Sequence, residues 1–323
     1  MSEEPTGTAA DGGEPDDEGT LTFGDRWTYR WADRKKPAIH PLRSPAGHVL
    51  TRMQPADHPW HRALWFAIKY LDDENFWEEV PPYGVQRHRE EPTVTGPAAD
   101  GRTTVEGTLV WTRPDRTTTA LEERRRLTHV PLGDGAYAID LDTRLMPAAD
   151  VTFRSEPFTT WGGYGGLSLR GRADWHDTRL LLADGSAHER VIGEPSPWCD
   201  LSGPVGEGDG DVAGIAILDH PGNPRHPVPW YGSTRAATYG DEGWSNFLNA
   251  AFLFHEPMSL AAGEQLRLRH RVIVHDGAWG VEEVGAAHDA WVNEAKSATA
   301  TRRSAHSIRL PVIVAPVRPR PRG

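Results

Sequence analysis

The stretch that decides the fold is AYAIDLDTRL, residues 136–145, together with its later counterpart QLRLRHRVIVH, residues 265–275. From Tyr137 to Leu145, every second residue is aromatic, aliphatic or threonine, and the residues between them are small or charged. This period of two is typical of a β-strand with one buried and one wet face. The second stretch repeats it, with leucine and valine mainly on one face and three arginines on the other. Both stretches therefore predict long strands.

Shorter runs outside these two stretches have a similar strand-like composition. They lie at 63–70, 104–111, 179–182 and 212–218, and clusters of Gly, Pro and Asp at 132–135, 184–186 and 221–224 separate them. Such clusters mark turns. Helical periodicity is convincing only over 285–297. We therefore predict an all-β protein, a large antiparallel β-sandwich with a short C-terminal helix.

Length and charge set the expected domain organisation and exclude one class of partner. The chain has 323 residues, and 35 Lys and Arg against 46 Asp and Glu give a formal net charge of −11. We expect one β-sandwich domain over 21–300, a disordered acidic tail over 1–20, and a basic tail rich in Pro and Arg over 301–323. The acidic balance argues against nucleic acid as the partner, because phosphate binding needs a basic face.

The same composition bears on localisation and on redox chemistry. No run of eighteen apolar residues occurs, and the first thirty residues contain no apolar core of a secretory signal. The single cysteine excludes a disulfide framework and a cysteine-based zinc site. We expect a cytoplasmic protein that acts without a membrane.

Residues 57–66, DHPWHRALWF, form the densest cluster of polar and aromatic side chains. Pro59 disfavours a helix through this segment. Imidazoles titrate near neutral pH, so His58 and His61 are candidate catalytic acids or bases at the mouth of the sandwich. Trp65 is a candidate for stacking on a sugar ring. The structural alternative is that the two histidines cap a strand and bond backbone groups.

A second segment, residues 219–230, repeats the Asp-His-Pro tripeptide of 57–59. It follows the predicted strand 212–218, and loops leaving a rigid scaffold are where binding groups usually lie. Four prolines stiffen this loop and preorganise its side chains. His226 is a third candidate acid or base, and Asp219 would orient one imidazole. Asn223 and Arg225 would bind hydroxyl or keto oxygens. The alternative is a rigid surface turn.

Three further motifs are weaker. The glycine-rich stretch 156–170 lacks the spacing of a nucleotide-binding loop, and its glycines indicate a bulge or a close approach to a ligand. Arg170 would bind substrate oxygens there, or pair with a surface acid. Asn75 and Trp77 follow a strand and would add a polar contact and a stacking surface. The run EERRR at 122–126 is interpreted as a solvated strand face without a function.

Metal binding is the sharpest alternative for the histidines. Neutral imidazoles of His58, His61, His88 and His226 with a carboxylate would suit Zn, Mn or Fe. No short ligand motif selects a metal in this sequence, so no cofactor is predicted, and a divalent metal remains the alternative.

Five strings together resemble the PmoA-like family, which is labelled methane oxygenase PmoA. They are HPLRSPAGHVLTRMQPADHPWHRALWFAI (40–68), ENFWEE (74–79), YGGLSLR (164–170), DHPGNPRHPVPWY (219–231) and LAAGEQLRLRHRVIVHDG (260–277). The family pattern usually has more histidines in the first string, where this chain has Trp60, and a glycine where it has Ala63. The segment Leu260–Glu264 is also similar to the end of a galactose-mutarotase-type supersandwich.

The resemblance implies a bacterial β-sandwich protein of sugar catabolism, acting beside a sugar dehydrogenase of the Gfo/Idh/MocA type. The positions that match the family are Asp57, His58, His61, Trp65, Asn75, Trp77, His88, Arg170, Asp219, His220, Asn223, Arg225 and His226.

These observations lead to one hypothesis and two alternatives. The hypothesis is a carbohydrate-active enzyme that acts on a sugar or keto-sugar by His-mediated proton transfer, as a lyase, epimerase or hydrolase. It requires His58, His61 and His226 to converge on one small ligand. The alternatives are a non-catalytic carbohydrate-binding or accessory protein, which requires Trp65 and Trp77 in one exposed groove, and a metal-dependent oxygenase.

Overall fold

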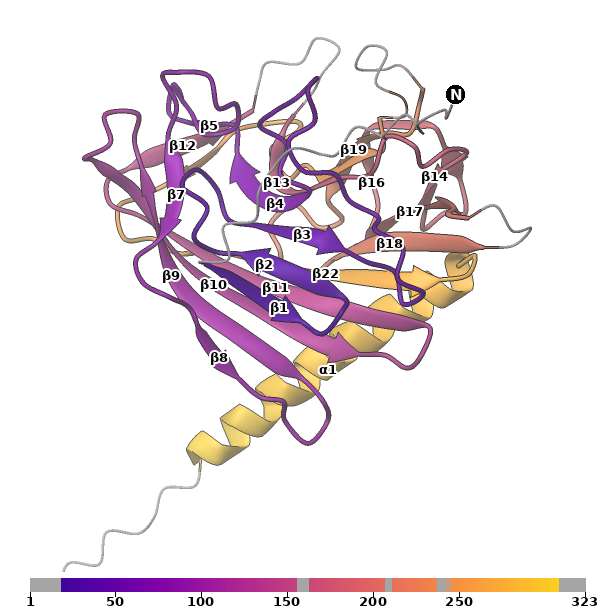
Figure 1. Ribbon diagram of the computed structural model, residues 1–323. Helices are drawn as coiled ribbons and strands as arrows, with labels where there is room; N and C mark the ends of the chain where they lie inside the picture. The colour runs from indigo at the N-terminus through magenta and orange to yellow at the C-terminus, as the bar shows by residue number, and fades with distance from the viewer. Residues whose placement is uncertain (1–18, 156–162, 207–210, 237–242, 244, 308–323) are drawn as a thin grey trace, which may run out of the picture.

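The computed structural model describes residues 19–155, 163–206, 211–236, 243 and 245–307, and from residue 295 onward only the backbone. It confirms the all-β prediction, because every strand pair within this part of the chain is antiparallel and two large sheets form a sandwich (Figure 1). The expected tails over 1–20 and 301–323 lie mainly outside the described residues.

The strands form three sheets, and within each sheet hydrogen-bonded neighbours follow one another in space. The 8-stranded sheet contains β1 (Thr20–Phe23), β2 (Trp27–Arg30), β3 (Ala38–Leu42), β4 (Leu64–Ile68), β13 (Gly165–Arg170), β20 (Phe247–Ala250), β19 (Pro229–Ser233) and β16 (Arg190–Pro195). The 10-stranded sheet contains β15 (Ala187–His188), β14 (Arg179–Leu182), β17 (Trp198–Pro204), β18 (Val212–Asp219), β22 (Leu266–Asp276), β11 (Ala136–Pro147), β10 (Thr119–Pro131), β9 (Thr103–Thr112) and β7 (Val85–His88), with β8 (Thr93–Thr95) also paired to β9. A 4-stranded sheet contains β21 (Met258–Leu260), β12 (Val151–Arg154), β5 (Tyr70–Leu71) and β6 (Glu74–Asn75).

The two stretches that decide the fold become neighbouring strands. β11 pairs with β22 in a continuous antiparallel register that runs from Ala136 opposite His275 to Leu145 opposite Leu266. The helix α1 (Val281–Ser307) starts four residues before the predicted one and continues ten residues beyond it, into the range expected to be a tail. It lies across the outer face of the 10-stranded sheet (Figure 1).

Apolar side chains form three layers, which is one more than a simple sandwich with a covering helix needs. The main core lies between the two large sheets, and a second cluster lies between the 10-stranded sheet and α1. The third lies on the other side of the 8-stranded sheet, and we call it the outer aromatic cluster. Its buried members are Ala38, Trp65, Ala67, Trp77, Tyr231, Phe247 and Ala251.

Strand β4 shows why this third layer exists. Its side chains alternate, so that Leu64, Phe66 and Ile68 enter the main core while Trp65 and Ala67 enter the outer aromatic cluster. All five residues are buried. A strand with apolar residues on both faces must be covered on both sides, so the loops before and after β4 have to cover the 8-stranded sheet.

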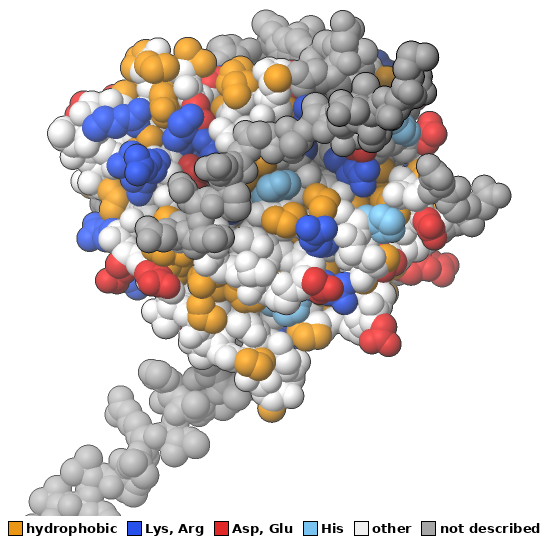
Figure 2. All heavy atoms as spheres, viewed as in Figure 1, with side chains coloured by type: hydrophobic (Ala, Val, Ile, Leu, Met, Phe, Trp, Pro, Cys, Tyr) orange, Lys and Arg blue, Asp and Glu red, His pale blue; other side chains and the backbone are white. Residues whose placement is uncertain are grey.

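The surface outside these layers is polar, with charge of both signs. Figure 2 shows one face, on which Lys and Arg side chains gather at the upper left and acidic side chains lie mainly along the lower and right margins. Positive and negative side chains therefore occupy different parts of this face.

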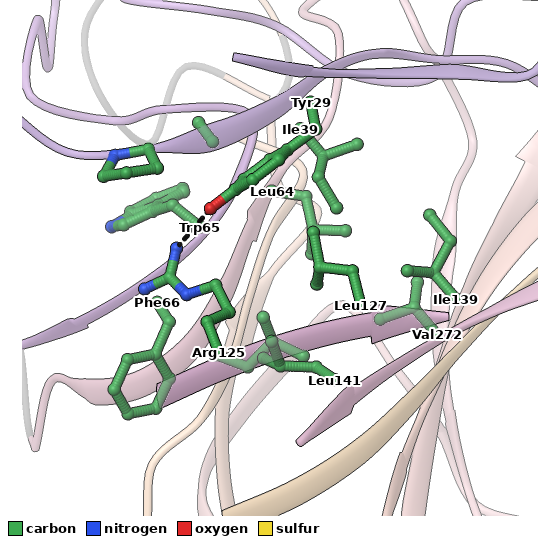
Figure 3. A pocket seen from close by; sticks show the side chains of 13 residues that line it. Tyr29, Ile39, Leu64, Trp65, Phe66, Arg125, Leu127, Ile139, Leu141 and Val272 are labelled. Atoms are coloured by element: carbon green, nitrogen blue, oxygen red, sulfur yellow. Dashed lines mark hydrogen bonds between the residues drawn. The ribbon is translucent and has the colours of Figure 1, made fainter. Parts of the chain in front are cut away.

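The run at 122–126 is not the fully solvated face predicted for it. Glu123 and Arg125 are buried, and Arg125 Nε donates to Glu123 Oε1 at 2.6 Å. Figure 3 shows Arg125 and Tyr29 at a cavity between the sheets, where the guanidinium donates to the Tyr29 hydroxyl. Because this cavity measures only about 20 Å³, it has room for one water molecule at most and is not a substrate site. Alternate residues of a strand point to opposite faces, so a run of five charges cannot be solvated throughout when one face is core.

Candidate functional site

The segment that leads into β4 folds so that its two histidines meet. The His58 amide donates to the Pro55 carbonyl at 3.1 Å, and the His61 amide donates to the His58 carbonyl at 2.9 Å. These two consecutive turns bring the imidazoles of His58 and His61 into a stack with ring centroids 4.7 Å apart. Pro59 lies between them in a turn and not in a helix, so the turn geometry brings the two rings together.

An arginine from the neighbouring strand fixes the aspartate of this segment. Arg170, at the end of β13, donates from Nη2 to Asp57 Oδ2 at 2.7 Å, and both side chains are buried. Nδ1 of His58 lies 3.2 Å from the same oxygen. Burial acts to raise the pKa of Asp57, but contacts with His58 and Arg170 outweigh it and lower that pKa to about 2. The carboxylate is therefore charged at neutral pH, and His58, with 24% of its side chain exposed, is the member of this group that solvent reaches most.

His61 lies beneath His58 and is held uncharged. Burial, together with the positive charges of Arg170, His58 and Lys36, lowers its pKa well below 6.5. Its Nδ1 lies 3.4 Å from Arg170 Nη1, and since a guanidinium has no acceptor, Nδ1 must be the accepting nitrogen. The ring also stacks on Phe247 of β20, with ring centroids 5.0 Å apart. His61 is thus a neutral, buried support for the exposed imidazole.

The two tryptophans expected to stack on a sugar do not have an exposed face. Trp65 and Trp77 are 2% and 1% exposed, and they pack on each other with ring centroids 5.5 Å apart. The prediction that they line one open groove is therefore wrong. Three half-buried aromatic side chains pack against this cluster: Trp60, Tyr164 and Phe254. The ring of Trp60 lies 5.2 Å from His58, and Tyr164 stacks on Trp77 at 5.1 Å. Trp60 lies inside the 57–66 segment, so proximity to the histidines was the signal that could have found it.

Asn75 has a structural role in the turn after β6. Its Oδ1 accepts hydrogen bonds from the backbone amides of Trp77 at 2.8 Å and Glu78 at 3.1 Å. An asparagine that bonds its own following backbone shapes a turn. This turn positions Trp77 in the outer aromatic cluster.

Sequence reasoning missed a buried charged group under the same loops. Lys36 donates to the carbonyl of Trp77 and lies 3.5 Å from Glu79 Oε1. Arg62 forms a two-pronged contact with that carboxylate at 2.8 and 2.7 Å. Burial lowers the pKa of Lys36 to about 8. These residues come from separate loops, so no local motif signals their meeting.

The second Asp-His-Pro segment is held together by its own aspartate. Asp219 Oδ2 lies 2.7 Å from His226 Nδ1 and accepts from the Val228 amide at 3.1 Å. Asn223 Nδ2 donates to Asp219 Oδ1 at 2.7 Å, and Asn223 Oδ1 accepts from the Arg269 amide at 2.8 Å. Asp219 and Asn223 thereby pin the loop to the end of β18 and to β22.

Arg225 and His220 also have structural partners in this loop. Arg225 donates to the carbonyls of Phe252 at 2.7 Å and Pro257 at 2.8 Å, and so braces the turns after β20. His220 packs its ring 5.2 Å from Trp291 of α1. Neither side chain contacts the Asp57 group.

The expected convergence of three histidines does not occur. In the β19–β20 pair, Phe247 lies opposite Ser233 and Ala250 opposite Trp230. His61 stacks on Phe247 at one end, while His226 precedes Trp230 at the other. His226 therefore belongs to a separate cluster, and the three-histidine site is wrong.

The four-histidine metal set is not assembled either. His88 lies on β7 of the other large sheet, where its Nε2 is 2.7 Å from the Tyr29 hydroxyl. Within the residues that the structure describes, no three His, Cys, Asp or Glu side chains are grouped so that they could hold a metal ion.

Replacing Asp219 with Asn is expected to destabilise the fold without affecting chemistry at His58. Hydrogen bonds to a charged group are worth about 1.5–3 kcal/mol, and the variant weakens those that hold the 219–228 loop. We expect the free energy of unfolding, measured by urea denaturation, to fall by about 2 kcal/mol. Any activity that depends on His58 should be unchanged, because Asp219 belongs to a separate cluster. If a folded Asp219→Asn variant loses such activity, Asp219 must contribute to the same site as His58.

Stability is expected to fall as the pH falls below about 6.5. Burial, with the charge of Arg125, lowers the pKa of His88 to about 3, and His61 is likewise held neutral when folded. In the unfolded chain both imidazoles bind protons below about pH 6.5, so acid favours unfolding. The cost is about 1 kcal/mol per imidazole at about pH 5.5. Urea unfolding of wild type and His88→Gln at neutral pH and at this lower pH tests the prediction, since the variant should lose about 1 kcal/mol less on acidification. Equal losses would contradict it.

The fold and this geometry define a class of protein. It is an antiparallel β-sandwich with a histidine–aspartate–arginine group against an aromatic layer on the outside of one sheet. The chain belongs to the family of unknown function DUF6807, which it matches over residues 20–289. This match overturns the expected assignment to the PmoA-like family. The dehydrogenase partner rested on that resemblance alone, and it is not supported.

Similarity to solved structures is distant. The chain is similar to a galactose mutarotase related enzyme from Lactobacillus acidophilus, with 9% identity and a TM-score of 0.40 over 81% of this chain and 98% of that one. No curated protein matches the sequence. Among the described residues, no helix has the length and apolar character needed to cross a membrane.

Proposed function

We propose that the protein acts on a sugar or keto-sugar by proton transfer at His58. The observation that carries the proposal is the arrangement at Asp57, where Arg170 holds a charged carboxylate 3.2 Å from Nδ1 of His58. A carboxylate at Nδ1 favours the tautomer in which Nε2 carries the lone pair. Nε2 would then take a proton from the substrate and return it, as a general base and acid.

The residues around His58 have positioning roles in this proposal. Arg170 fixes Asp57, and the neutral ring of His61 supports His58 by stacking. Because the pKa of His61 is far below neutrality, that imidazole does not compete for the substrate proton at physiological pH. These roles replace the substrate-binding role that the sequence suggested for Arg170 and the catalytic role that it suggested for His61.

The proposed substrate class rests on the side chains beside the reactive imidazole. Half-buried Trp60 lies beside His58, and half-buried Tyr164 packs on Trp77 and Phe247 of the same cluster. A pyranose has an apolar C–H face that suits an aromatic ring and hydroxyls that suit polar partners. Lyase, epimerase and hydrolase reactions of sugars all include a proton transfer that a positioned histidine can carry out.

The test is incubation of the purified protein with free aldoses, glucosides and 3-keto-glucosides, followed by NMR of the products. A lyase yields an unsaturated or keto product, an epimerase an inverted centre, and a hydrolase a free sugar. We expect at least one of these products from one substrate class. Saturable binding without product would overturn catalysis and leave a carbohydrate-binding role, and absence of both would overturn the proposal.

A further inference from the structure

Three arginines form a row across the outer face of the 10-stranded sheet. Arg124 of β10 lies directly opposite Arg144 of β11, which lies directly opposite Arg267 of β22. We call these three residues the arginine row. Neighbouring strands are about 4.8 Å apart, and like charges directly opposite each other destabilise a sheet. In a chain with a net charge of −11, this concentration of positive charge requires a physical reason.

One acid pairs with two of the three arginines in the row. Asp142 accepts from Arg267 at 2.9 and 2.5 Å, and its Oδ1 lies 3.5 Å from Arg144 Nε. Arg269 lies opposite Asp142 in the strand register, but its guanidinium lies against Gly222 in the loop after β18. Neither Arg124 nor Arg269 has an ion pair within the part of the chain that the structure describes. Asp142 therefore pairs with Arg144 and Arg267 and leaves Arg124 as the member of the row without an ion pair among the described residues.

The row adjoins a hollow large enough for a small molecule. Arg124 and Arg144 line a surface hollow of about 440 Å³, which lies within the range of small-molecule sites. Glu90 and Glu91, from the connection between β7 and β8, also line it. The other charged side chains that line this hollow are paired. Arg126 donates to Glu106 at 2.7 Å, Arg125 pairs with Glu123, and Asp142 pairs with Arg267. The hollow thus has a basic end at the row and an acidic wall.

We propose that Arg124 and Arg144, the two members of the row that line the hollow, bind the phosphate group of a small phosphomonoester, whose hydroxyl groups contact Glu90 and Glu91. Phosphate oxygens accept hydrogen bonds from several guanidinium groups at once and neutralise their mutual repulsion. The two glutamates accept hydrogen bonds from hydroxyls but repel a second phosphate. The site lies on the 10-stranded sheet, whereas the His58 group lies on the 8-stranded sheet, so the two proposals stand independently.

Isothermal titration calorimetry at constant ionic strength tests this proposal with three probes. They are inorganic phosphate, glucose 6-phosphate and fructose 1,6-bisphosphate. We expect glucose 6-phosphate to bind more tightly than inorganic phosphate, and the bisphosphate to gain nothing from its second phosphate. Arg124→Gln is expected to weaken glucose 6-phosphate binding about tenfold, since it removes one charge-assisted contact. Arg124 is exposed, and its loss relieves repulsion in the row, so this variant should fold.

The matched control is Arg172→Gln, which removes a surface arginine paired with Asp174 away from the hollow. It should bind glucose 6-phosphate as wild type does. The proposal is overturned if wild type shows no saturable binding, or if both variants lose affinity equally. Equal affinities for inorganic phosphate and glucose 6-phosphate, both lost in Arg124→Gln, would overturn the contact with the glutamates and leave free phosphate as the occupant.

Discussion

Replacing Arg170 with Met is expected to lower the free energy of unfolding by about 3–5 kcal/mol, the cost of leaving one partner of a buried ion pair without the other. The Arg170 and Asp57 side chains are only 1% and 5% exposed. Without the guanidinium, the Asp57 carboxylate stays in a place that solvent barely reaches, and His61 loses its donor at Nδ1. Chemical denaturation followed by circular dichroism gives the free energy directly.

The control for this prediction is Arg172→Met, two residues along the chain. Arg172 pairs with Asp174 at the surface, and exposed pairs contribute about 0–1 kcal/mol. A second variant separates the ion pair from lost packing: adding Asp57→Asn to Arg170→Met should restore part of the loss, because the unpaired charge disappears. If Arg170→Met unfolds at the same denaturant concentration as Arg172→Met, the buried pair does not hold the site together.

Replacing His58 with Asn is expected to reduce turnover by about 10²–10⁴-fold on whichever sugar the substrate panel identifies. Asparagine preserves polarity and approximate size but cannot exchange a proton at neutral pH. His58 is partly exposed, so the variant should keep the wild-type fold and most of its affinity for the sugar. Steady-state kinetics should therefore show the loss in kcat and little change in KM.

His188→Asn is the matched control for this experiment. His188 is partly buried on β15, at the edge of the other large sheet, and its Nε2 contacts its neighbour Ser186 at 2.8 Å. It should keep wild-type turnover. If His58→Asn keeps full activity, a group other than His58 transfers the proton, and the proposed function loses its basis.

The strands could be predicted from the sequence because alternation of apolar and polar residues is a property of neighbouring positions in the chain. Alternation in 136–145 and 265–275 reflects one buried and one wet face, and it predicted both strands and the antiparallel sandwich. The helix near 285–297 was also found, although its length was underestimated. Residues 57–66 form the densest polar and aromatic cluster in the sequence, and His58 and His61 of this segment stack on each other. Their function stays a prediction.

The composition of the site was decided by tertiary structure alone. The pairing of Asp57 with Arg170 joins residues 113 positions apart, and the loss of His226 from the site follows from the register of β19 and β20. The sequence suggested that Trp65 and Trp77 stack on a sugar, but both are buried members of the outer aromatic cluster. The arginine row likewise exists only because β10, β11 and β22 are neighbours in one register. A sequence records which faces of a strand are apolar, because that property repeats locally. Which strands become neighbours, and in what register, depends on contacts between distant segments, and those contacts decide which charges meet.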